Sequence, residues 1–204
     1  MALSNGKTLN FATQFASTLT YGSGYVSFNQ NPRFCYDIDG DGKADLIGFS
    51  NSGIYVQDST GVSFAPPFLV GNYFTYSQGW TNWNTQPICI GKINNGCGAD
   101  IIGFSNTGVM VSSFNGRTFN APVSMLPGQY GVSAGGWATF DQYPRLCVDM
   151  NGDGKTDLVA FGNGFVGITY AKADGTFGET SGQVGEDTSQ LAWGSTTSFN
   201  INPR

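Results

Sequence analysis

A nine-residue acidic segment that occurs twice constrains this chain more than any other feature. The residues from Asp37 to Asp45 read Asp-Ile-Asp-Gly-Asp-Gly-Lys-Ala-Asp, and those from Asp149 to Asp157 read Asp-Met-Asn-Gly-Asp-Gly-Lys-Thr-Asp. Seven of the 14 acidic residues of the chain lie in these two segments. Oxygen ligands at positions 1, 3, 5, 7 and 9 of a loop, with glycine at position 6, are typical of calcium loops.

We therefore predict two calcium sites, each with side-chain ligands at positions 1, 3, 5 and 9 and a lysine backbone carbonyl at position 7. The ligands of the first site are Asp37, Asp39, Asp41, Lys43 and Asp45, and those of the second are Asp149, Asn151, Asp153, Lys155 and Asp157. The alternative is an ordinary Asp/Gly turn that binds nothing. Carboxylates crowded without a cation would repel one another, which favours the ion.

The residues around the loops indicate that they join strands. A helical EF-hand needs a bidentate glutamate at position 12, and this position is Gly48 in the first loop and Ala160 in the second. Both loops lead into β-rich segments, Leu46–Phe49 and Leu158–Phe161, which do not have the pattern of amphipathic helices.

The two loops belong to a longer repeat with a third copy between them. Pro32, Pro87 and Pro144 each stand five residues before the loop position, so the period is about 55 to 57 residues. The middle loop runs from Lys92 to Asp100, where only Asn94 and Asp100 keep ligand character, and we expect it to hold no metal. Each repeat reads as four short strands between turns rich in Gly, Asn, Ser and Pro. A period near 50 residues with four strands is typical of propeller blades.

The predicted fold is therefore an all-β propeller of four-stranded blades, with three full units and two partial ones. The approximate units are 1–24 (partial), 25–79, 80–136, 137–193 and 194–204 (partial). Because propellers usually close with four to eight blades, we expect a homo-oligomer, with a dimer favoured. In that arrangement residues 1–24 of one chain would meet residues 194–204 of another. Truncation of a longer chain is the competing explanation.

The repeat resembles the FG-GAP or VCBS repeat of integrin α-chain propellers, and most closely that of fungal N-acetylglucosamine-binding lectins of the Psathyrella velutina type. The resemblance rests on the acidic loop, the following Leu-x-x-Phe, the Gly-Ile/Val-x-Val strand, the Pro-Arg pairs at 32–33 and 144–145, and the segments 72–80 and 130–137. It implies a calcium-stabilised, multivalent lectin with sugar sites between blades and an extracellular or cell-surface location. The chain departs from those lectins in having no histidine and about half of the expected blades.

Aromatic and polar side chains near the repeat junctions are the candidates for sugar contacts, since a sugar site needs a ring for the apolar face of the sugar and amides or hydroxyls for its polar groups. The predicted ligand-binding residues are Tyr25, Tyr76, Gln78, Trp80, Tyr130, Trp137 and Trp193. Packing between sheets is the alternative role for a tryptophan that recurs once per blade. Trp83, in Asn82-Trp83-Asn84, stands outside the repeat pattern and is a separate candidate for an exposed contact; the alternative is a rim residue with no partner.

Composition bounds the other functions. Without histidine the chain cannot form a Ser-His-Asp or Cys-His site, and the remaining acids show no cluster, so we expect no enzyme activity. A net charge of −5 without a basic patch argues against nucleic acid, and no apolar stretch is long enough to insert into a membrane. The first residues lack the features of a secretory signal. Glycans or glycoproteins are the expected partners; an integrin-like protein-interaction propeller without sugar binding is the alternative.

The four cysteines do not predict a disulfide. Cys35 and Cys147 occupy equivalent positions in repeats that are not neighbours, too far apart to bridge. Cys89 and Cys97 are close in sequence, but one is predicted in a strand and the other in the middle loop. We therefore expect free, buried thiols.

Overall fold

The computed structural model describes residues 15–96, 98–133 and 135–178, and these form three antiparallel sheets. Blade 1 contains β1 (Arg33–Tyr36), β2 (Asp45–Phe49), β3 (Ile54–Gln57) and β4 (Phe68–Gly71). Blade 2 contains β5 (Ile88–Gly91), β6 (Asp100–Ser105), β7 (Gly108–Ser112) and β8 (Val123–Pro127). Blade 3 contains β9 (Arg145–Val148), β10 (Asp157–Gly162) and β11 (Phe165–Thr169).

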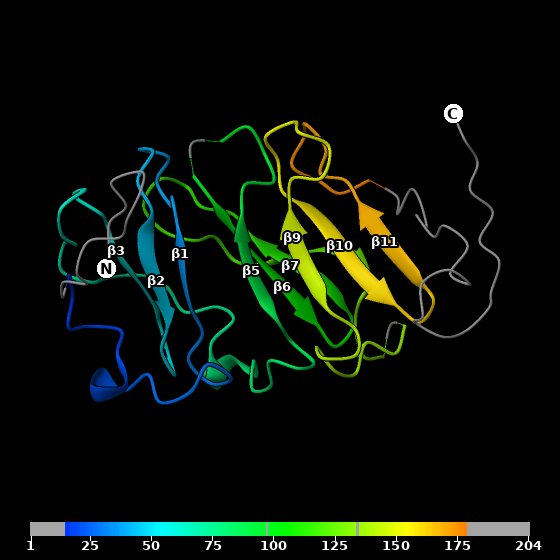
Figure 1. Cartoon of the computed structure of the whole chain (residues 1–204), viewed down its shortest axis with the longest axis horizontal. Helices are drawn as coiled ribbons and strands as arrows, with labels where there is room; N and C mark the ends of the chain where they lie inside the picture. Colours follow the sequence, from blue (N-terminus) through cyan, green and yellow to red (C-terminus); the bar gives the residue numbers. More distant parts are fainter. Residues whose placement is uncertain (1–14, 97, 134, 179–204) are drawn as a thin grey trace, which may run out of the picture.

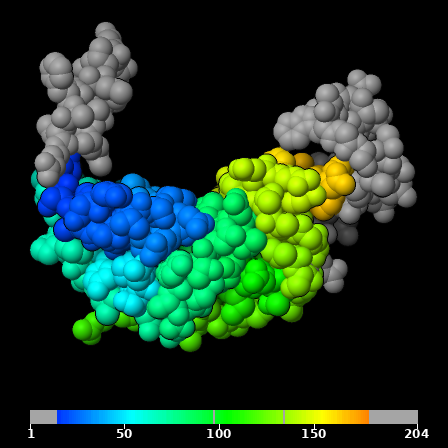
Figure 2. Space-filling model, turned by 90° about the horizontal axis from the view of Figure 1, so that it is seen from below, coloured from blue at the N-terminus to red at the C-terminus, as the bar shows by residue number. Residues whose placement is uncertain are grey.

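Within each sheet the strands pair in the order in which they follow along the chain. The three sheets follow one another round an open arc with a hollow on one side (Figures 1 and 2). Neighbouring sheets contact each other through their first strands, β1 with β5 and β5 with β9, as innermost propeller strands do. The predicted all-β propeller of four-stranded blades is confirmed, and its ring is not closed. The fourth strand predicted for blade 3 and the partial unit 194–204 lie outside the described residues.

Two 3-10 turns, η1 (Tyr21–Ser23) and η2 (Tyr76–Gln78), precede blades 1 and 2. They lie at one end of the first strands, and the predicted metal loops lie at the other end (Figure 1). None of the helices among the described residues is long and apolar enough to cross a membrane.

The hydrophobic core lies between the sheets, because each blade buries both faces only against its neighbours. Side chains alternate along β6, so Ile101 packs in the cluster shared with blade 1 and Ile102 in the cluster shared with blade 3. Both side chains are fully buried. The middle sheet therefore has no solvent-facing side at its centre.

The segment before each blade forms a cap that covers the second strand of that blade. The caps consist of two side chains, Leu19 and Tyr25 before blade 1, Phe74 and Trp80 before blade 2, and Tyr130 and Trp137 before blade 3. The first residue of each pair has a left-handed backbone, with φ of 55°, 56° and 61°. The three equivalent turns thus aim their side chains in the same way.

The cap explains why the second strands of blades 1 and 2 contain glycine, at Gly48 and Gly103. A Cβ on Gly103 would stand 2.5 Å from ring atoms of Phe74 and of Trp80. A Cβ on Gly48 would stand 2.8 Å from the ring of Tyr25 and 2.9 Å from Leu19. Blade 3 has Ala160 at the same position, buried with Tyr130 and Trp137.

We expect Gly103→Ala to destabilise the protein by about 1–3 kcal/mol, the usual cost of overpacking a well-packed core. The new methyl group would force the rings of Phe74 and Trp80 out of their places. A urea unfolding curve measures the change. Ala160→Gly is the matched control at the equivalent position, where no ring has to move; a midpoint for Gly103→Ala equal to that of the unchanged protein would contradict the cap.

The arginines of the two Pro-Arg pairs hold the caps of blades 1 and 3 in place. Arg145 is 1 % exposed, and its guanidinium donates hydrogen bonds to the carbonyls of Tyr130 (2.9 Å) and Asn84 (2.7 Å). Burial lowers its pKa to about 10, so the group stays charged at neutral pH. Arg33 donates in the same way to the carbonyl of Leu19 (3.1 Å).

A disulfide joins Cys89 of β5 to Cys147 of β9, with their Cα atoms 6.1 Å apart. The expectation of free thiols is therefore wrong for these two residues. Cys89 stands two residues after its repeat proline and Cys147 three, and successive side chains of a strand point to opposite faces, so the two thiols meet between neighbouring sheets. Cys35 is free but exposed rather than buried, and Cys97 lies outside the described residues.

Candidate functional site

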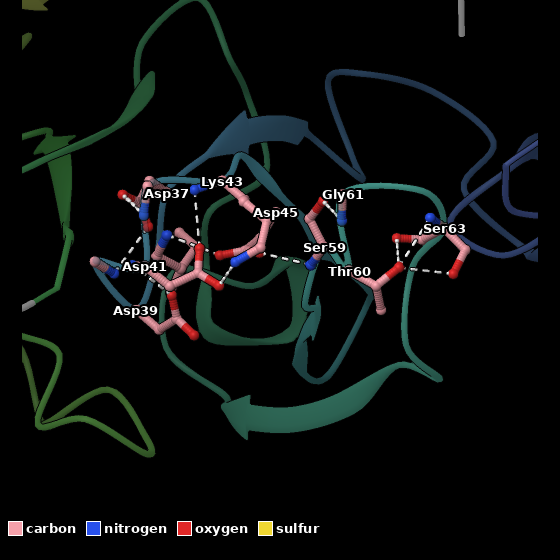
Figure 3. A network of polar contacts seen from close by, with 12 residues as sticks. Asp37, Asp39, Asp41, Lys43, Asp45, Ser59, Thr60, Gly61 and Ser63 are labelled. Carbon is pink, nitrogen blue, oxygen red and sulfur yellow. Dashed lines mark hydrogen bonds and ion pairs between the residues drawn. The ribbon is translucent and has the colours of Figure 1, made fainter.

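The first acidic loop has converging carboxylates. Single carboxylate oxygens of Asp37, Asp39 and Asp45 lie within 4.8 Å of one another, and Asp41 completes the loop (Figure 3). Backbone N–H groups hold the first residue in place, because Gly40 and Gly42 donate to the two carboxylate oxygens of Asp37 at 2.8 and 2.9 Å. The candidate side-chain ligands of this loop are all carboxylate oxygen atoms. Oxygen is the ligand type that calcium takes in proteins.

The second loop has the same conformation. Gly152 and Gly154 donate to the two carboxylate oxygens of Asp149 at 2.7 and 2.8 Å. The N–H of Asp153 donates to Asn151 (2.9 Å), as that of Asp41 does to Asp39 in the first loop (3.1 Å). The repeated sequence thus gives a repeated local structure, whether the third position is Asp or Asn.

In each loop a lysine side chain forms an ion pair with a carboxylate. The ammonium of Lys43 pairs with Asp41, and that of Lys155 pairs with Asp153 at 3.0 Å. Burial, with further repulsion from Asp39 and Asp41, raises the pKa of Asp45. A divalent cation among these oxygens would reverse that repulsion and would compete with the lysine for Asp41.

The last aspartate of each loop also has a structural role that the sequence did not reveal. Asp45 accepts the N–H of Ile38 (2.9 Å) and that of Ser59 (2.8 Å), which ties the loop to the turn between β3 and β4. Asp157 does the same with Met150 and Ala171, and Asp100 with Ile93 and Phe114. The middle loop keeps this aspartate although it lacks the other carboxylates. There the side-chain amide of Asn94 donates a hydrogen bond to the carboxylate of Asp100 (3.1 Å), so this carboxylate has a polar partner without an ion.

Most of the predicted sugar-binding side chains are packed inside the protein. Tyr25, Tyr130 and Trp137 are 6, 4 and 6 % exposed and belong to the caps. Trp80 is half-buried, with its ring 4.7 Å from that of Phe74. This packing is the alternative role that the sequence left open. Gln78 is exposed on η2, and Trp193 lies outside the described residues.

A surface groove lies between blades 1 and 2 and includes Tyr76, one of the predicted ligand-binding residues, and Trp83, the separate candidate, which is half-buried. Its volume is about 680 Å³, and we call it the junction groove. The groove is lined by Phe28, Asn29, Tyr76, Thr81, Asn82, Trp83 and Asn84. Tyr76 and Phe28 are 42 and 43 % exposed, so their rings are open to solvent. No lining residue carries a charge.

Hydrogen bonds between the two blades hold the groove in shape. The side chain of Asn29 accepts the N–H of Trp83 (2.6 Å) and donates to the carbonyl of Thr81 (3.3 Å). The ring of Trp83 lies 4.6 Å from that of Phe28, at a steep angle of 69°, and 6.0 Å from that of Phe34. These contacts fix the indole before any ligand arrives.

Trp83 is part of the repeat, contrary to the sequence interpretation. Phe28, Trp83 and Phe140 each stand four residues before a repeat proline, and the ring of Trp83 also lies 6.0 Å from that of Phe140. The aromatic position before the proline was the signal that sequence reasoning missed. Trp80 and Trp137, the tryptophans of the caps, stand three residues before this position and also recur with the repeat, so the sequence alone does not tell which ring reaches the groove.

The junction groove and the metal loops lie at opposite ends of the first strand. In blade 1 the groove residues Phe28 and Asn29 precede β1, and Asp37 follows it directly. A strand of this length spans roughly 13 Å. A ligand in the groove would therefore not contact an ion in the loop.

No protein-family model matches the sequence, and no curated protein is significantly similar to it. Among solved structures, the chain is similar to a lectin of Agrocybe aegerita, described for specific recognition of non-reducing terminal N-acetylglucosamine, with a TM-score of 0.75 and 28 % identity. The match covers 87 % of this chain and 45 % of that lectin, so the chain spans less than half of its length.

A second similar structure is the Tc holotoxin pore of Photorhabdus luminescens. It has a TM-score of 0.53 and 20 % identity, and the match covers 72 % of this chain and 7 % of that one. This second likeness concerns the fold alone.

Proposed function

We propose that this protein is a lectin that binds a neutral sugar of the N-acetylglucosamine type in the junction groove, without catalysis. The observation that carries the proposal is the lining of the groove, which combines exposed aromatic rings with asparagine and threonine side chains and has no charged group. The similarity to the N-acetylglucosamine-recognising lectin of Agrocybe aegerita supports the same ligand class.

The chemistry of the groove suits a pyranose ring with an acetamido group. Tyr76, Trp83 and Phe28 offer apolar surface to the C–H groups of the sugar. The amides of Asn82 and Asn84 and the hydroxyl of Thr81 offer donors and acceptors to its hydroxyl and acetamido groups. Because the groove is uncharged, we expect binding to change little with ionic strength.

The junction between blades 2 and 3 is a weaker site in this proposal. The position of Tyr76 is taken there by Val132 and that of Asn84 by Asp141. Loss of one ring and gain of a charge both reduce the fit to a neutral sugar. Multivalent binding would then depend on the number of junctions that keep the aromatic pair.

We also propose that both acidic loops hold calcium. Their oxygen donors, the shared loop conformation and the repulsion among the carboxylates support this assignment. Because the loops lie at the far end of the first strands, calcium would stabilise the blades and would not take part in sugar contacts.

Titration with N-acetylglucosamine tests the lectin proposal. We expect saturable binding, and we expect Trp83→Ala to weaken it at least about tenfold, equivalent to about 1.4 kcal/mol. Calorimetry measures the affinity directly. Phe68→Ala is the matched control, since Phe68 is 40 % exposed on β4 and does not line the groove.

Absence of binding by the unchanged protein would reject the lectin proposal and favour a protein-interaction propeller. Equal affinity for Trp83→Ala and the unchanged protein would instead show that a sugar binds elsewhere on the molecule.

A further inference from the structure

Two surfaces at the ends of the arc have counterparts that are buried between the blades. The forward face is formed by Leu146, Val148 and Met150 of blade 3, and the backward face by Cys35 and Ala44 of blade 1. We propose that the forward face binds the backward face of a second copy of this chain.

The exposure of the forward face is abnormal for its position in the repeat. Met150 is 47 % exposed, whereas Ile38 and Ile93, at the same position of blades 1 and 2, are each 1 % exposed. Leu146 and Val148 are 43 and 45 % exposed. Inside the chain, these positions are covered by the following blade.

The backward face shows the complementary difference. Ala99 and Thr156, which belong to blades 2 and 3, are 1 and 7 % exposed because they lie against the preceding blade. Their N–H groups donate to the preceding blade, to the carbonyls of Ile38 (3.0 Å) and Lys92 (2.7 Å). Ala44 has the same position in blade 1 and is exposed. Blade 1 nevertheless has its own cap, Leu19 and Tyr25, so its backward face is built like those of blades 2 and 3.

Side-chain volumes favour a second copy over an unrelated partner. Gly91 faces Thr156 inside the chain, where a Cβ on the glycine would stand 2.5 Å from the threonine hydroxyl oxygen. In the proposed contact the equivalent pair is Val148 with Ala44, so a larger residue on one side meets a smaller one on the other. The pair equivalent to Cys89 and Cys147 is Leu146 with Cys35.

The contact would also assemble a second junction groove. Tyr21 and Phe28 of blade 1 are 75 and 43 % exposed and match Tyr76 and Trp83 in the repeat. Phe140 and Asp141 of the other copy would supply the opposite wall, so this groove would carry a charge and fit a neutral sugar less well than the groove between blades 1 and 2. This part rests on the proposed lectin function, whereas the contact itself does not.

The Cys89–Cys147 disulfide provides a direct test, because its geometry should recur across the contact. We expect Leu146→Cys to form an intermolecular disulfide with Cys35 of a second copy under mild oxidation. Non-reducing electrophoresis should show a product of twice the chain mass, and peptide mass spectrometry should identify the linked positions. Light scattering of the unchanged protein should give at least twice the mass of one chain.

Two controls separate this contact from chance collision. Leu146→Cys combined with Cys35→Ser should give no linked product. Val123→Cys places a thiol on a residue that is 57 % exposed on β8 and should not link to Cys35. Met150→Glu should return the unlinked protein to the mass of one chain.

Equal linking from positions 123 and 146 would overturn the proposal. So would a single-chain mass together with an unlinked thiol at position 146, the result expected if residues 179–204 of the same chain cover the forward face. None of these linking or mass experiments uses a sugar. Absence of the contact between copies is therefore distinguished from absence of sugar binding in the junction groove.

Discussion

Replacing Cys147 with serine should lower the free energy of unfolding by about 4 kcal/mol, since the disulfide closes a sequence separation of 58 residues. In the chain-entropy model, the crosslink restricts the unfolded chain and so raises its free energy. Here it also joins the first strands of blades 2 and 3, where the two sheets meet. The urea midpoint of unfolding is the measurement.

Cys35→Ser is the matched control, because Cys35 is unpaired and exposed at the equivalent strand position of blade 1. It should leave the midpoint unchanged. Reducing the disulfide of the unchanged protein should reproduce the effect of Cys147→Ser and should have no further effect on that variant. A midpoint that is insensitive to both treatments would contradict the prediction.

Removal of calcium should have the second large effect. Each occupied loop should stabilise the folded protein by about 2.7 kcal/mol when free calcium is about one hundred times its dissociation constant, because the unfolded chain has no preformed site. A chelator should therefore lower the melting temperature. The repulsion among Asp39, Asp41 and Asp45 would then be unscreened by an ion.

Single substitutions test which of the loops bind calcium. Asp41→Ala and Asp153→Ala should each remove about one bound calcium per chain, measured as metal content after dialysis. Asn95→Ala, in the middle loop, should leave the content unchanged. Identical melting curves with and without chelator would reject the calcium proposal and leave the loops as hydrogen-bonded turns.

The fold followed from the sequence because its signals are local and repeated. The prolines at 32, 87 and 144 set the repeat, and the turns between short β-rich segments set the strand order. That the acidic segments form loops between strands could be predicted for the same reason, whereas their occupation by calcium stays a prediction. Glycines at fixed places and hydrogen bonds within each loop set most of its conformation, and the last aspartate then ties the loop to the turn after the third strand.

Contacts between blades could not be predicted in this way. Whether Trp80 or Trp83 reaches solvent depends on which sheet each ring lies against, and this depends on the cap turn with its left-handed Phe74. The two pairs that the sequence suggests, Cys35 with Cys147 and Cys89 with Cys97, do not include the pair that forms. Equal repeat positions and nearness in sequence do not tell which side chains face each other between two sheets. A bridge between adjacent sheets instead needs positions of opposite parity, as at Cys89 and Cys147.

The caps also shift the boundary at which the chain can usefully be divided. Phe74 and Trp80 follow the last strand of blade 1 but pack on Gly103 of blade 2. A gene fragment for an isolated blade 2 that begins at Trp80 would lose half of its cap, whereas one that begins before Phe74 would keep it. The same offset decides where blades can be exchanged between related propellers: the crossover belongs after β4, ahead of the turn.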